Sequence, residues 1–214
     1  MIATWRSVNE SDSWSTNLLQ GLMNLRATTL ISGLLLLLAF SGPPLRAGES
    51  QPTEYQVKAA FVFNFAKFVE WPSTGFPSAD TPISIGVVCE SGSAFETDLK
   101  STTANKTING RRLIINRVTS TQEMKACHIL FVCRSEKSEK QEKRRLEELF
   151  QSLRGGNVLT IGESDAFIPA GGIINFVTED RKIRFEIKDA AARQAGLKIS
   201  SKLLTLARKR EGGT

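Results

Sequence analysis

Two apolar stretches decide the fold of this chain: Pro82-Ile83-Ser84-Ile85-Gly86-Val87-Val88-Cys89 and Cys127-His128-Ile129-Leu130-Phe131-Val132-Cys133. Both are rich in the β-branched and aromatic residues that favour strands. Neither shows the apolar–polar alternation of a strand with one solvated face. We therefore expect both stretches to be strands buried within a sheet.

Helical and strand-like patterns alternate around these two stretches. Further strands are expected at 113–115 and 157–161, and helices at 92–101, 119–125 and 138–154. This alternation predicts an α/β fold, a three-layer sandwich with a largely parallel sheet. Nearer the end of the chain, 172–177 and 182–187 flank the polar Glu179-Asp180-Arg181, which predicts an antiparallel C-terminal hairpin and hence a mixed sheet.

The first helix of the folded part is expected from Glu54 to Val69, with Thr53 as its N-cap. Phe61, Phe65 and Phe68 recur at helical spacing and so share one face, which is typical of a helix packed on a sheet. Phe63 lies off that face. A helix this rich in phenylalanine could also present part of its surface to a partner.

The first 47 residues differ from the rest of the chain. A basic residue, Arg26, precedes the apolar run from Leu30 to Phe40, and Ser41-Gly42-Pro43-Pro44 follows it. The apolar run is too short to span about 30 Å of hydrocarbon, and proline ends any helix there. This order predicts a secretory signal peptide over residues 1–47 and a single exported domain over 48–214.

The composition excludes several classes of function. Lys and Arg number 28 against 22 Asp and Glu, a net charge of +6, and the basic residues are dispersed among acidic ones. Nucleic-acid binding needs a clustered basic surface, so we do not expect it. One histidine and three cysteines exclude every two-histidine metal motif, and neither metal nor cofactor is expected.

No catalytic constellation is found in the sequence. His128 lies inside an apolar strand, where a structural role is more probable than general-base catalysis. The glycine pairs at 155–156 and 171–172 match no phosphate-binding motif and indicate turns. Glu147 and Glu148 occupy consecutive helical positions that do not face each other.

Three cysteines in an exported protein suggest one disulfide and one buried thiol. Cys127 and Cys133 are six residues apart on one extended strand, a separation of roughly 20 Å, so they cannot pair with each other. A bridge from Cys89 to Cys127 is plausible, and a bridge from Cys89 to Cys133 stays open.

Four segments, in order, resemble the YfiR family. They are Tyr55-Gln56-Val57-Lys58-Ala59-Ala60-Phe61-Val62-Phe63-Asn64-Phe65-Ala66-Lys67-Phe68-Val69-Glu70-Trp71-Pro72, Cys127-His128-Ile129-Leu130-Phe131, the run from Gly172 to Ala192, and Gly196-Leu197-Lys198-Ile199-Ser200-Ser201-Lys202-Leu203-Leu204. The resemblance covers about Glu54 to Arg208.

The resemblance implies a non-enzymatic regulator in the periplasm with a tendency to form homodimers. Such a regulator binds the periplasmic part of an inner-membrane diguanylate cyclase and represses it, which lowers cyclic di-GMP and biofilm formation. An outer-membrane lipoprotein would relieve the repression. The family's disulfide corresponds to Cys89–Cys127 here, which leaves Cys133 as the buried thiol.

The surface that contacts the partner is expected on the hairpin, at Glu179, Phe185, Glu186 and Ile187, together with Phe63 of the first helix. Interfaces of this kind combine an aromatic, apolar centre with a charged rim. The alternative for Phe185 and Ile187 is a place in the core. The alternative function is a small-molecule-sensing subunit of a sensor histidine kinase system, which would need a concave apolar pocket.

Overall fold

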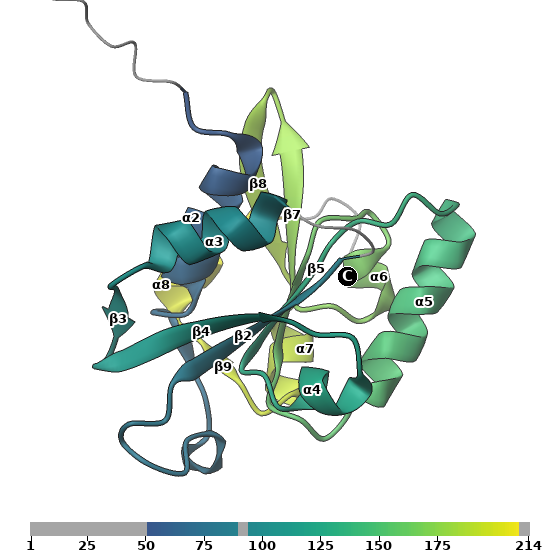
Figure 1. Cartoon of the computed structure of the whole chain (residues 1–214). Coiled ribbons are helices and arrows are strands. Elements are labelled where there is room, and N and C mark those ends of the chain that lie inside the picture. Colours follow the sequence, from purple (N-terminus) through teal and green to yellow (C-terminus); the bar gives the residue numbers. More distant parts are fainter. Residues whose placement is uncertain (1–50, 90–93, 210–214) are drawn as a thin grey trace, which may run out of the picture. The chain divides into compact units, whose positions relative to one another are not determined.

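A mixed sheet runs through the centre of the structure, a computed structural model that describes residues 51–89 and 94–209 (Figure 1). In these residues seven strands hydrogen-bond in the order β3-β4-β2-β5-β6-β7-β8. The strands are β2 (Ile83–Val88), β3 (Thr107–Ile108), β4 (Arg111–Arg117), β5 (Ile129–Val132), β6 (Leu159–Gly162), β7 (Ile174–Glu179) and β8 (Lys182–Ile187). The five central strands β4, β2, β5, β6 and β7 are parallel.

The predicted C-terminal hairpin is confirmed. Strands β7 and β8 pair antiparallel, with Phe176 opposite Phe185. The two turn residues, Asp180 and Arg181, both have positive φ, at 50° and 59°. A two-residue turn with this geometry matches the right-handed twist of the strands that it joins. The largely parallel, mixed α/β sheet expected from the sequence is therefore present.

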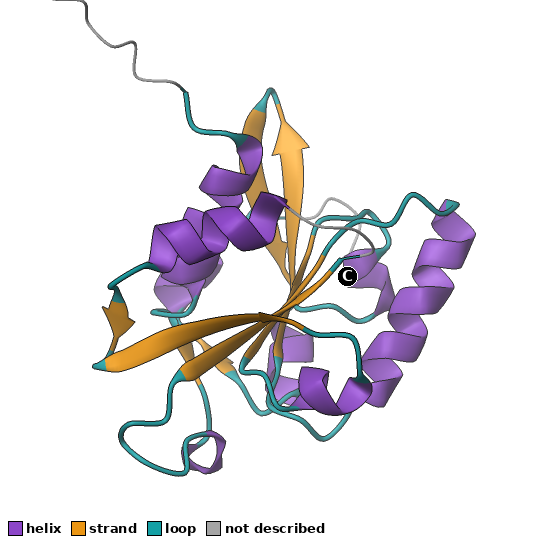
Figure 2. Ribbon diagram, in the orientation of Figure 1, coloured by secondary structure: helices purple, strands orange, loops and turns teal. Residues whose placement is uncertain are grey.

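Helices lie on both faces of the sheet (Figure 2). They are α2 (Glu54–Phe65), α3 (Ala94–Thr103), α4 (Thr121–Lys125), α5 (Glu139–Ser152), α6 (Phe167–Ala170), α7 (Asp189–Gln194) and α8 (Ser201–Leu206). Thr53 caps α2 as predicted, in a capping box with Gln56. No helix among the described residues is long and apolar enough to cross a membrane.

The first helix ends four residues earlier than predicted. It stops at Phe65, and Val69–Glu70 forms a short strand, β1, that pairs antiparallel with β9 (Lys198–Ile199). This second, two-stranded sheet joins residues about 130 positions apart, so the local helical pattern could not reveal it. A 3-10 turn, Ser73–Gly75, follows β1.

Strand β5 shows why the sheet is buried on both faces. Ile129 and Phe131 belong to one hydrophobic core, with α2 and α3, while Leu130 and Val132 belong to a second core, with α5 and α6. The larger core holds the stacked rings of Phe95 and Phe131, whose centroids are 3.7 Å apart. Truncating such a buried phenylalanine to alanine typically costs about 3–5 kcal/mol.

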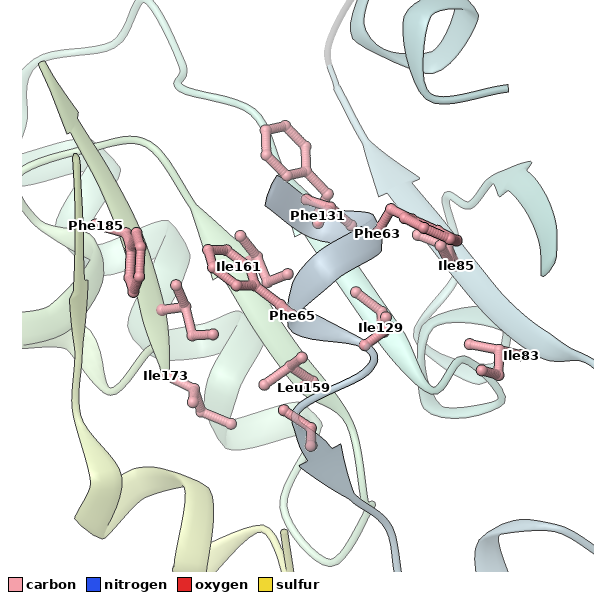
Figure 3. Close-up of a cluster of buried hydrophobic side chains, with 14 of the residues drawn as sticks. Phe63, Phe65, Ile83, Ile85, Ile129, Phe131, Leu159, Ile161, Ile173 and Phe185 are labelled. Carbon is pink, nitrogen blue, oxygen red and sulfur yellow. The ribbon is translucent and has the colours of Figure 1, made fainter. Parts of the chain in front are cut away.

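Side chains of α2 fill the larger core from one side (Figure 3). Phe65 projects toward Ile161 and Phe185, whereas Phe63 projects toward Ile85 of β2. Phe65 and Phe185 pack edge to face at 4.9 Å. The predicted signal peptide, residues 1–47, lies outside the described residues.

Candidate partner-binding surface

The carboxyl end of the parallel sheet is where an α/β fold of this type would bind a ligand. The chain leaves β2 through α3 to β4 on one side, and then returns through α4 to β5 on the other side of β2. In open α/β sheets, ligands bind at such a switch point, outside the carboxyl ends of the strands. Here that point lies between β2 and β5.

A disulfide bridges the switch point. Cys89 and Cys133 are bonded, with their Cα atoms 5.0 Å apart. The register of the strands explains this pairing. Strands β2 and β5 are parallel, Val88 pairs with Val132, and each cysteine directly follows the last residue of its strand. The predicted pairing of Cys89 with Cys127 is therefore wrong, as is the prediction that Cys133 is the buried thiol.

Cys127 lies at the opposite end of β5 and is the free, buried cysteine. Its thiol donates to the Glu123 carbonyl and accepts from the Ser84 hydroxyl. Burial raises the pKa of this thiol, and the charge of Glu123 adds to the rise, while the bond from Ser84 opposes it. A thiol kept protonated and covered is a poor nucleophile, so Cys127 is structural.

Near the carboxyl ends of β5 and β6, a lysine is buried among acidic side chains. Lys58 of α2 is 5% exposed, and its Nζ lies 2.6 Å from Glu163 Oε2 and 2.5 Å from Glu54 Oε1. Glu163 follows β6 and also accepts from the backbone N–H of Arg134, which follows β5. Burial lowers the pKa of Lys58, but the bonds and charges of Glu163 and Glu54 outweigh it and raise that pKa overall.

These groups line a cleft of about 430 Å³ beside the start of α2. Its charged side chains carry both signs, with Glu54, Glu163 and Asp165 facing Lys58, Arg134 and Arg208. Arg134 pairs with Asp165 at 3.3 Å. Since the charges in the cleft largely pair with one another, this cleft joins elements together and offers no strong field to a charged ligand.

The hairpin residues predicted to contact a partner divide into buried and exposed ones. Phe185 is core: it packs on Phe61 and Phe65 of α2, and a partner cannot reach it in this conformation. Glu186 is also buried, 3.3 Å from Arg208, and Ile187 is half-buried. Glu179 alone of the four is exposed, with Arg208 3.6 Å away.

Phe63, the fifth predicted contact residue, lies at the margin of the core and is 9% exposed. Two lysine ammonium groups lie over its ring, Lys67 at 4.2 Å from the centroid and Lys106 at 5.1 Å. The structure does not bring Phe63 together with the hairpin residues, since Phe63 projects toward β2 (Figure 3). Because Lys106 follows α3, the sequence pattern of α2 alone could not have indicated it.

His128 has the structural role expected from the sequence. Its Nδ1 accepts from the Ser84 backbone N–H at 3.1 Å, and its Nε2 donates to the Gly75 carbonyl at 2.9 Å, which defines a neutral ring. Phe76 stacks on that ring at 4.4 Å. Burial lowers the pKa of His128 and the charge of Arg111 lowers it further, against the opposing effect of the Gly75 bond.

A groove of about 700 Å³ lies between α5, α6 and α7. Its lining combines the apolar side chains of Phe150, Leu153, Val158 and Ile173 with the polar ones of Gln151, Arg154 and Gln194. Within the described residues, no three His, Cys, Asp or Glu side chains lie close enough to hold a metal ion.

Comparison with protein-family models agrees with the sequence resemblance. No curated protein matches this chain. A crystal structure of a conserved domain protein from Vibrio cholerae O1 biovar eltor str. N16961 is similar with a TM-score of 0.47 at 13% identity. The similarity covers 74% of this chain and 60% of that one, so the chain spans less than two thirds of the protein that it matches. The model of the YfiR/HmsC-like family matches residues 55–208. The chain belongs to the YfiR/HmsC-like family, a family of periplasmic, regulatory proteins of diguanylate cyclase signalling.

Proposed function

We propose that this protein, once its first 47 residues are removed, binds the periplasmic part of an inner-membrane diguanylate cyclase and represses it. In this proposal the protein has no enzymatic activity, and its effect is to lower cyclic di-GMP. The observation that carries the proposal is the family match, which runs from residue 55 to residue 208 and so includes nearly all of the described chain.

Repression from the periplasm must act through differential binding. The substrate GTP is cytoplasmic, so the regulator can only favour the inactive state of a membrane-spanning partner over the active one. Moving that partner from 1:99 to 99:1 needs about 5.5 kcal/mol of differential affinity, which one protein interface can supply.

The cross-linked carboxyl end of the sheet supports a binding role. The Cys89–Cys133 bridge occupies the position at which related architectures open a ligand crevice, and the neighbouring Lys58 is neutralised by Glu163 and Glu54. What this protein offers to a partner is therefore its outer surface, on which Glu179 and the surroundings of Phe63 are accessible.

The proposal is tested by reconstitution. The tagged mature chain is incubated with detergent-solubilised inner membrane, and the captured proteins are identified by mass spectrometry. A captured diguanylate cyclase is then placed in nanodiscs, and its conversion of GTP to cyclic di-GMP is measured with and without the mature chain. Inhibition supports the proposal. Capture of no cyclase, or a captured cyclase whose rate does not change, contradicts it.

The groove between α5, α6 and α7 favours a second candidate, a small-molecule-sensing subunit of a sensor histidine kinase system. It is a concave site in which apolar side chains lie beside polar ones that could orient a small ligand. A thermal-shift screen of the mature chain against amino acids, nucleosides and short peptides tests this candidate. A stabilising ligand whose effect is lost in Gln194→Trp, which places a bulky side chain at an exposed lining position, would favour the sensor.

Formation of homodimers and release of repression by an outer-membrane lipoprotein stay predictions from the resemblance. Sedimentation of the mature chain over a range of concentrations tests the first. Co-purification with outer-membrane lipoproteins tests the second.

A further inference from the structure

Two lysines from different parts of the chain converge on one aromatic ring. Lys67 follows α2 and Lys106 follows α3, and their ammonium groups lie 4.2 Å and 5.1 Å from the centroid of Phe63. The two positive charges are thus no farther apart than the sum of these distances. Both side chains are exposed to solvent.

The backbone holds both lysines in place. Lys67 N–H donates to the Asn64 carbonyl, and its Nζ donates to Asn64 Oδ1 at 3.2 Å. Asn105, at φ 58°, reverses the chain directly before Lys106, and Lys106 N–H donates to the Thr103 carbonyl. The left-handed residue after α3 turns Lys106 back over the ring, an arrangement typical of helix ends.

This pair of charges lacks an acidic neighbour. Among the described residues, no carboxylate oxygen lies within 4 Å of Lys67 or Lys106, whereas Lys58, Lys100, Lys143 and Lys198 each have at least one. Two like charges over one ring repel each other, and an incoming carboxylate would relieve that repulsion while the ring attracts the ammonium groups.

We propose that the surface formed by Phe63, Lys67 and Lys106 docks an acidic segment of a protein partner, with Asp or Glu carboxylates bound between the two ammonium groups. This inference names the contact chemistry of the partner binding proposed above and rests on it. Charge complementarity of this kind increases the association rate and selects the partner.

An anionic membrane is a poorer occupant of this surface. Membrane-surface binding buries protruding apolar side chains below the headgroups, whereas Phe63 is 9% exposed and lies beneath its two lysines. Two ammonium groups held over one ring match the spacing of a pair of carboxylates on a peptide better than they match a flat layer of headgroups.

A hexaglutamate peptide is the probe. It is titrated into the ¹⁵N-labelled mature chain, and binding is followed by NMR at the amides of Phe63, Lys67 and Lys106. Lys67→Gln/Lys106→Gln should weaken saturable binding about tenfold, equivalent to about 1.4 kcal/mol. Lys125→Gln/Lys140→Gln removes the same charge from exposed positions on α4 and α5 and should leave binding unchanged. Lys67→Arg/Lys106→Arg keeps both charges and should bind the peptide as tightly as the natural sequence does.

Three results would overturn the inference: no binding of the peptide, equal weakening by the two glutamine pairs, or shifts that map elsewhere. Phosphatidylglycerol vesicles form the second arm. If the vesicles bind through these lysines and the peptide does not, the surface recognises a membrane.

A cellular arm separates this inference from the proposed function. If deletion of the gene raises cyclic di-GMP and the Lys67→Glu/Lys106→Glu protein restores repression fully, the docking surface is wrong while the function stands. If deletion changes nothing, the repressor function fails, and the peptide titration still decides whether an acidic segment binds.

Discussion

The two ends of the parallel sheet are held together by different chemistry. At the carboxyl end, the Cys89–Cys133 bond and the ion pair between Lys58 and Glu163 join β2, β5, β6 and α2. At the amino end, a neutral His128 joins β5 to the turn after β1 through hydrogen bonds and ring stacking. The first set of contacts is covalent or ionic. The second depends on a neutral side chain whose pKa is lowered by burial.

Because of this difference, the amino end of the sheet can respond to the pH of its surroundings. Cross-links at the carboxyl end fix the central strands. The amino end loses contacts when His128 takes up a proton, because Nδ1 can then no longer accept from the Ser84 N–H.

Removing the disulfide should cost the most stability. Cys133→Ala opens a bridge with a sequence separation of 44 residues, for which the loop-entropy relation gives about 4 kcal/mol. Urea denaturation of the oxidised protein and of the variant measures the difference. Adding Cys89→Ala to the variant should cost little more. Non-reducing peptide mapping should recover Cys89 linked to Cys133, and a Cys89–Cys127 peptide would contradict the assignment.

Breaking the buried ion pair should come next. Lys58→Met leaves the Glu163 carboxylate buried without its cation, at a cost of about 3 kcal/mol in the free energy of unfolding. Lys58→Met/Glu163→Leu removes both charges and should recover most of the loss. The control is Lys100→Met, which breaks an exposed pair with Glu96 and should cost less than about 1 kcal/mol. Equal changes in the free energy of unfolding for Lys58→Met and Lys100→Met would show that the burial of Lys58 does not strengthen its ion pair.

The amino end should weaken in mild acid. Since the pKa of His128 is lowered by folding, the unfolded chain binds its proton at a higher pH than the folded one. The contribution of His128 to the free energy of unfolding is therefore fully present above about pH 6.5. It is lost as the pH falls from there through the pKa of the folded state. Thermal denaturation between pH 5 and pH 8 measures this. His128→Gln should flatten that part of the profile, and an unchanged slope would assign it to other groups.

The smallest effect is expected at Glu179. Its pair with Arg208 is solvent-exposed, so Glu179→Lys should change the free energy of unfolding by less than about 1 kcal/mol. The variant therefore reports on partner binding without a folding defect. Glu186→Lys, at the buried member of the same hairpin, is the contrast and should destabilise the fold measurably.

The sheet could be predicted from the sequence because its strands carry their own signal. The apolar runs at 83–88 and 129–132 lack alternation, and the hairpin strands flank a polar turn, so type and order follow from local patterns. The end of α2 could not be predicted in this way, because β1 is stabilised by β9, far along the chain.

The site residues were harder to predict, since their roles depend on register and packing. Cys89 and Cys133 could have been paired from the sequence by noting that each directly follows a buried strand and that parallel neighbours end together. The burial of Lys58 could not be predicted, because lysine is rarely buried unless it is paired, and its partner Glu163 is 105 positions away in the sequence. For Phe185 the sequence leaves both a surface and a core position open, because the centre of an interface and a core share an aromatic, apolar composition.

The most direct test of the account is the cellular level of cyclic di-GMP in a deletion strain and in strains that express either the intact gene or a version without residues 1–47. If the protein represses a diguanylate cyclase from the periplasm, deletion raises cyclic di-GMP, the intact gene restores the original level, and the version lacking residues 1–47 does not. An unchanged level after deletion would contradict repression of a diguanylate cyclase. Full restoration by the version lacking residues 1–47 would contradict action from the periplasm.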